Sequence, residues 1–200
     1  MAGGVFDLEK QFAFYAAYHS HATNILIHTL FVWPIFFTVL VLECFTPAIG
    51  VLPFPPGIFP FQEYMVLNFS FVTAVVYALF YIMLDKKAGA IAGALCFLCW
   101  VSSNALAQRL GFSLAWKVVL VSQLVCWTSQ FIGHGVFEKR APALLDNLVQ
   151  AFMMAPFFVL FEVLQKFCGY EPYPGFKKNV RAKVQANVKE WRAKKQKKSA

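Results

Sequence analysis

Long apolar stretches separated by short polar breaks run through most of the 200-residue chain. They cover about residues 25–42, 65–84, 88–107, 112–132 and 148–167. A helix of about 20 residues is long enough to cross the roughly 30 Å hydrocarbon core of a bilayer. The pattern therefore predicts an all-α fold, a polytopic integral membrane helical bundle.

The polar breaks indicate how this bundle is arranged. A Lys-Lys pair at residues 86–87 ends the second stretch, a turn at 109–111 ends the third, and Pro156 interrupts the fifth. Because Lys and Arg gather on the cytosolic side, we expect the Lys/Arg-free loop 43–64 in the lumen. We predict about four spanning helices. The segment around Pro156 would form a re-entrant or interfacial helix pair, which keeps both termini cytosolic.

Charge is concentrated at the C-terminal end of the chain. The sequence is 59% hydrophobic and 14% charged, with a net charge of +8, and residues 177–200 hold ten Lys/Arg and one Glu. Residues 1–176 hold eight Lys/Arg and nine Asp/Glu, so we expect no nucleic-acid-binding core. This division predicts a membrane-embedded catalytic domain, residues 1–176, and a basic cytosolic tail, residues 177–200.

The tail has a helical pattern of its own. Val180, Val184, Val188 and Trp191 recur at helical spacing among lysines and arginines. This pattern predicts an amphipathic helix that lies on the lipid bilayer and is attracted to anionic lipid. The final residues, KKSA, are similar to a dilysine retrieval signal of the endoplasmic reticulum membrane; a generic basic end is the alternative.

Small residues gather in the third apolar stretch. Gly89 and Gly93 form a G-x-x-x-G pattern, which permits close contact between helices. Cys96 and Cys99 form a C-x-x-C, but no second pair accompanies it. We therefore favour small packing residues over a redox or metal motif.

Three of the four histidines, His19, His21 and His28, lie where a polar entry leads into the first apolar stretch. At about 100° per residue, His19 and His28 would lie on opposite sides of a straight helix. A site that uses both requires a bend between them, and Thr23 or Asn24 is the expected N-cap that supplies it.

The fourth histidine, His134, ends the fourth stretch, and Glu138 follows four residues later. The charge pattern puts all four histidines on the cytosolic side, and polar residues at membrane depth usually line interior sites. Singly, each histidine could be an interfacial hydrogen-bonding group or a helix cap. Together they favour a metal site, and imidazoles with a carboxylate suit non-haem Fe(II) and also Zn.

Two motifs with matching spacing carry a family resemblance. The first is Tyr15-x3-His19-x4-Asn24-x3-His28 with Pro34 beyond it; the second is Gln130-Phe131-Ile132-Gly133-His134 followed by Glu138, Pro142-Ala143-Leu144 and Asp146-Asn147. Over most of residues 5–168 the chain resembles the metal-dependent 2-hydroxy fatty acid dioxygenases, first known from yeast. Phe31 stands where family members often have glycine. We carry no functional role from the family over to His21.

The resemblance implies an enzyme of the endoplasmic reticulum membrane. It would use Fe(II) and O₂ to shorten a 2-hydroxy fatty acid by one carbon, in the α-oxidation that follows phytosphingosine breakdown. The implied metal ligands are His19, His28 and His134. The implied catalytic residues, which hold the substrate head group, orient a ligand or supply a fourth one, are Asn24, Gln130 and Glu138. Lys139 and Arg140 would attract the fatty carboxylate or form a solvated positive pair, and the oligomeric state stays open.

Two other functions compete with this interpretation. A di-iron desaturase or hydroxylase is disfavoured, because such enzymes carry eight or more histidines in H-x-x-H-H boxes and this chain has four, none adjacent. A non-catalytic membrane-shaping or lipid-handling protein of the endoplasmic reticulum is the main alternative. It predicts no metal and no dependence on the histidines.

Overall fold

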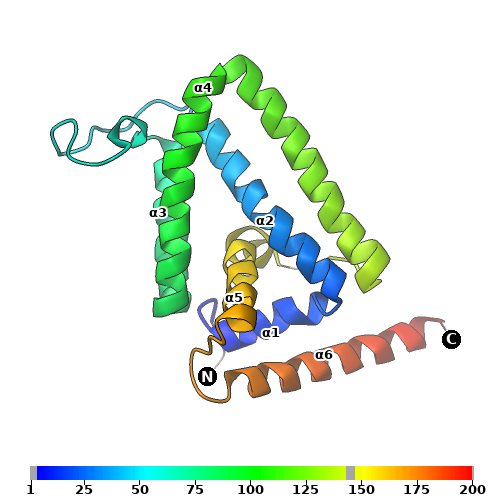
Figure 1. Cartoon of the computed structure of the whole chain (residues 1–200). Coiled ribbons are helices and arrows are strands. Elements are labelled where there is room, and N and C mark those ends of the chain that lie inside the picture. The colour runs from blue at the N-terminus through cyan, green and yellow to red at the C-terminus, as the bar shows by residue number, and fades with distance from the viewer. Residues whose placement is uncertain (1–3, 143–146, 200) are drawn as a thin grey trace. The chain divides into compact units, whose positions relative to one another are not determined.

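The computed structural model describes residues 4–142 and 147–199, and every regular element assigned within those ranges is helical (Figure 1). The all-α prediction is therefore confirmed for the described part of the chain. The elements in order are α1 (Leu8–Tyr18), α2 (Ala22–Glu43), the 3₁₀ turn η1 (Gln62–Tyr64), α3 (Phe69–Leu84), α4 (Lys86–Ile132), the π-helices η2 (Gly133–Glu138) and η3 (Val149–Met154), α5 (Ala155–Phe167) and α6 (Phe176–Ser199).

Within the described residues, three helical stretches are long and apolar enough to cross a membrane: Ala22–Glu43, Lys86–Glu138 and Val149–Phe167. The apolar helix α3 is shorter, at 16 residues. The predicted turn between the third and fourth apolar stretches is a break inside α4, where Gly111 has φ 65° and ψ 161°. This left-handed backbone suits glycine, which has no Cβ to clash. The predicted number of four spans remains a prediction.

The chain divides into two compact units, and residues 30–130 form one of them. Within it, α3 and the first part of α4 approach closely at the predicted G-x-x-x-G. A Cβ on Gly89 would lie 2.1 Å from the Tyr81 carbonyl oxygen, and one on Gly93 would lie 3.3 Å from the Ala78 Cβ. Cys96 is buried and free, as expected of a small packing residue.

The other unit joins the two ends of the chain, residues 1–29 and 131–200. Its core is aromatic, because the Phe12 ring of α1 packs against Phe158 and Phe161 of α5 and Phe176 of α6, at centroid distances of 4.9 to 6.1 Å. The tail thus forms the predicted helix. The first part of its apolar side, which includes Val180, is buried within this unit. All three candidate ligand histidines belong to this unit.

Two local predictions differ from the structure. Pro156 lies in the first turn of α5, directly after the π-helix η3, and the chain stays helical from Val149 to Phe167. A reversal at Pro156 is therefore not confirmed. The expected cap at Thr23 or Asn24 is wrong, since α2 already begins at Ala22 and the Asn24 side chain bonds elsewhere.

Candidate metal centre

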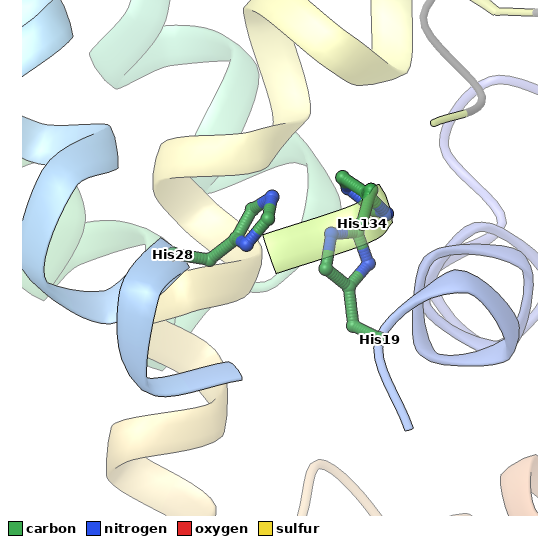
Figure 2. Close-up of side chains that lie close together, drawn as sticks. All are labelled: His19, His28 and His134. Atoms are coloured by element: carbon green, nitrogen blue, oxygen red, sulfur yellow. The ribbon is translucent and has the colours of Figure 1, made fainter. Parts of the chain in front are cut away.

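Three imidazoles from three helical elements converge in the unit built from the chain ends (Figure 2). His19 caps the C-terminal end of α1, His28 lies in the second turn of α2, and His134 lies at the start of η2. Their ring centroids are 4.3, 4.8 and 4.9 Å apart. One nitrogen from each ring lies within 4.8 Å of the other two, so the three side chains could hold a metal ion together.

The bend that brings His19 to His28 occupies residues 19–21, between α1 and α2. The structure thus contains the break that a shared site requires, slightly earlier than predicted. His21 is exposed, and its Nδ1 accepts a hydrogen bond from the Thr23 N–H at 3.2 Å. His21 therefore stabilises the start of α2 and stays outside the cluster.

Backbone carbonyls fix the orientation of two of the rings. Nδ1 of His19 donates to the Tyr15 oxygen at 2.8 Å, and Nδ1 of His28 donates to the Asn24 oxygen at 3.0 Å. Because a carbonyl can only accept, each proton sits on Nδ1 and each Nε2 keeps its lone pair for a ligand bond. The Tyr15 ring also stacks on His19, with centroids 4.0 Å apart.

Two ring nitrogens of the cluster are free to bind a metal ion. Among the described residues, His19 Nε2 and His134 Nδ1 are buried and have no hydrogen-bond partner. Burial, reinforced by His28 and His134, holds the pKa of His19 well below its usual range, so the ring is neutral at physiological pH. Ligand nitrogens on one ion lie about 3 to 3.4 Å apart, so binding would draw these rings slightly together.

Glu138 holds the bend rather than joining the cluster. Its carboxylate accepts hydrogen bonds from the Ser20 N–H and hydroxyl, from the His21 N–H at 2.9 Å and from the Asn24 side-chain amide at 3.2 Å. These donors lie between α1 and the first turn of α2, where an anion is favourable. Glu138 comes from η2, four residues after His134, so one carboxylate links all three histidine-bearing segments.

Asn24 is the second link between these segments. Its side-chain amide also donates to the Tyr18 oxygen at 3.3 Å, and the whole residue is buried. Gly133 of η2 lies directly against it, since a Cβ there would approach Asn24 Oδ1 to 2.3 Å. Only glycine permits this contact between η2 and α2, next to His134.

The remaining predicted residues have different surroundings. Gln130 belongs to the unit of residues 30–130, is buried, and its amide has no hydrogen-bond partner among the described residues. Arg140 donates to the Ala17 oxygen at 2.7 Å and lies over the Tyr18 ring, so it connects the segment after η2 to α1. The predicted motif residues Ala143, Leu144 and Asp146 lie outside the described residues.

Sequence reasoning missed two partners of the cluster. Ser20 gave no signal, because its use depends on a carboxylate 118 residues away. Glu162 of α5 accepts a hydrogen bond from the Tyr15 hydroxyl at 3.4 Å, beside the ring that stacks on His19. A carboxylate inside an apolar helix is itself a signal of an interior site, and this signal could have found Glu162.

Two comparisons with known proteins find related sequences. Residues 5–167 match the family model described as 2-hydroxy-palmitic acid dioxygenase Mpo1-like. The chain is 36% identical over 172 residues to the 2-hydroxy-palmitic acid dioxygenase MPO1 of Saccharomyces cerevisiae, covering 86% of this chain and 87% of that protein. No solved structure matches.

Proposed function

This chain belongs to the 2-hydroxy-palmitic acid dioxygenase Mpo1-like family, and from this premise we propose that it is an Fe(II)-dependent dioxygenase. It converts 2-hydroxy fatty acids to fatty acids one carbon shorter. The observation that carries the proposal is the convergence of His19, His28 and His134, each of which offers a ring nitrogen within 4.8 Å of the other two.

His19, His28 and His134 are the proposed iron ligands. Imidazole suits iron as well as zinc and copper, so the choice of Fe(II) rests on the family's dioxygenase activity. Bound Fe(II) would supply the positions at which O₂ and substrate meet. The chain's own contribution is to present three imidazoles to one ion. In His19 and His28 the backbone contacts hold the proton on Nδ1 and leave Nε2 free.

The proposed catalytic residues divide by their contacts. Glu138 and Asn24 position the histidines, because they bind the bend and the first turns of α2. Gln130 stays a candidate for holding the substrate head group, one helical turn before His134 in the same motif. Its buried, unpartnered amide supports a polar ligand.

We further propose a cytosolic orientation for the site in the endoplasmic reticulum membrane. The predicted spans are α2, α3 and the two halves of α4, with the substrate's acyl chain among the apolar helices. The contacts of α5 support an interfacial position, because its Phe158 and Phe161 pack on Phe12 of the short, charged helix α1. An interfacial α5 keeps the basic tail cytosolic.

The test is product analysis with purified protein. We expect protein reconstituted anaerobically with Fe(II) to convert 2-hydroxypalmitate and O₂ to the 15-carbon acid, as part of an α-oxidation that serves sphingolipid degradation. Unhydroxylated palmitate should give no product. If the iron-loaded protein leaves 2-hydroxypalmitate unchanged, the dioxygenase proposal fails, and a membrane-shaping or lipid-handling role takes its place.

A further inference from the structure

A groove of about 550 Å³ runs between α6 and the bend that follows His19, inside the unit of chain ends. Its apolar wall is made by Val184, Val188 and Ala193 of α6. Ser20 forms part of the facing side. This volume is within the range of small-molecule sites, and the apolar wall suits a hydrocarbon segment.

Two cations line the same groove. Lys189 and Arg192 are exposed, and no described residue pairs with either of them, whereas Lys183 is paired with Glu9 and Lys194 with Glu190. No acidic side chain is among the described residues that line the groove. The groove therefore combines apolar surface with uncommitted positive charge, which is complementary to an amphiphilic anion.

Ser20 is the point at which the groove contacts the histidine-bearing bend. This residue directly follows His19, and its N–H and hydroxyl both donate to Glu138. α6 is also fixed to this region by Arg140, which donates to Asn187 at 3.2 Å and faces the Trp191 ring at 5.1 Å. An anion bound at Lys189 and Arg192 would thus lie in the groove that Ser20 lines, next to the bend that carries His19.

We propose that this groove captures the carboxylate head group of a long-chain fatty acid before it reaches the histidines. The inference rests on the proposed function, since that function requires a long-chain acid at this cluster. Lys189 and Arg192 bind the carboxylate, and Val184, Val188 and Ala193 cover the first part of its chain. Uncommitted charges beside a site raise the local concentration of an oppositely charged substrate.

The test measures occupancy of the groove directly, without metal or turnover. Ala193→Cys introduces a thiol into the groove, and Ala182→Cys introduces a matched one on the same helix, exposed and outside the groove. Modification of each thiol by a polar maleimide is followed by peptide mass spectrometry, with full-length protein in phosphatidylcholine nanodiscs. Palmitate is the probe, and hexadecanol is the uncharged control.

We expect palmitate at ten times its dissociation constant to slow modification at position 193 about tenfold and to leave position 182 unchanged. Hexadecanol should protect neither thiol. In the Ala193→Cys background, Lys189→Gln with Arg192→Gln should raise the half-protecting palmitate concentration roughly fivefold or more. Lys178→Gln with Arg181→Gln, which removes equal charge outside the groove, should not change it.

Equal protection by hexadecanol, equal protection at position 182, or an equal effect of the two charge-removing pairs would each overturn the proposal. Protection that appears only when phosphatidylserine is added to the nanodiscs, and not with palmitate, would assign the groove to lipid head groups and would also overturn it. These outcomes are independent of catalysis, so a failed groove and a failed dioxygenase assignment are distinguishable.

Discussion

At the scale of single residues, the site depends on what lies behind each imidazole. The cost of placing imidazole at membrane depth predicted a metal site from all four histidines. The family resemblance then selected His19, His28 and His134 as its ligands. The sequence could not predict the carbonyls of Tyr15 and Asn24 that orient two of the rings, since these contacts follow from helical geometry around a bend. Glu138 was predicted either to bind the metal or to accept a hydrogen bond that orients an imidazole. Its contact with the His21 N–H supports an orienting role, in which it acts on the backbone next to His19.

Gly133→Ala tests the contact between η2 and α2. The new methyl would meet Asn24 Oδ1 at 2.3 Å, so we expect a loss of about 1 to 3 kcal/mol in stability and weaker metal binding. Thermal unfolding in detergent and metal analysis measure the two effects. Gly135→Ala is the matched control, because nothing lies within 4 Å of its added Cβ and alanine favours the helix. Equal behaviour of the two variants would contradict the packing described here.

Glu138→Gln tests the carboxylate that holds the bend. Glutamine can accept fewer of the hydrogen bonds from Ser20, His21 and Asn24, so His19 should be less well positioned. We expect metal affinity to fall by about 10- to 100-fold, as is typical when residues that orient ligands are changed. Glu190→Gln, which affects only an exposed pair with Lys194, is the control. Unchanged affinity in Glu138→Gln would remove this residue from the site.

At the scale of helices, apolar length and small residues predicted most of the fold. The G-x-x-x-G contact of Gly89 and Gly93 and the break at Gly111 follow from chemistry that a sequence displays. The surface against which a helix packs cannot be identified from the sequence in this way. The apolar side of α6 was expected to face lipid, yet Phe176 packs on Phe12 of α1, because a helix covers its apolar residues with whatever surface the fold brings near.

The pairing of α1 with α6 should depend on pH. Glu9 accepts hydrogen bonds from Lys183 at 2.6 Å, from Tyr173 and from Asn179, and the bond to Lys183 contributes most to lowering the pKa of Glu9 to about 2. A lowered pKa means that the contribution is complete above the unfolded value near 4.3 and is lost as pH falls towards 2. Hydrogen exchange of α6, corrected for intrinsic rates, should therefore rise between pH 5 and 2.

Glu9→Gln provides the comparison for this prediction. Its α6 should exchange faster already at pH 7, and it should show little further change on acidification, because the titrating group is gone. Glu190→Gln should keep the wild-type pH profile. A wild-type profile in Glu9→Gln would show that another group controls the docking of α6.

At the scale of the whole molecule, the two chain ends form one unit and carry every proposed metal ligand. The positive-inside argument predicted that His28 and His134 share one membrane side, and their rings are 4.9 Å apart. What the sequence could not supply was the path of the segment around Pro156, because a proline in an apolar run permits a break, a kink or the start of a helix. The structure has the start of α5 there.

The proposed orientation predicts where glycosylation can occur. An acceptor sequence placed in loop 43–64 should be modified in microsomes, because this Lys/Arg-free loop is expected in the lumen. An acceptor fused after residue 200 should stay unmodified, as a cytosolic tail requires. Modification of the C-terminal acceptor would mean that Val149–Phe167 crosses the membrane as a full span.

Anaerobic Fe(II) titration of the purified protein measures whether imidazoles from both ends of the chain hold a single metal ion. We expect one tight site per chain, and in His28→Ala and His134→Ala an affinity loss greater than the roughly 100-fold that orienting residues contribute. His21→Ala, which changes an exposed histidine outside the cluster, should bind iron like the wild type. Wild-type iron affinity in His28→Ala and His134→Ala would contradict the account.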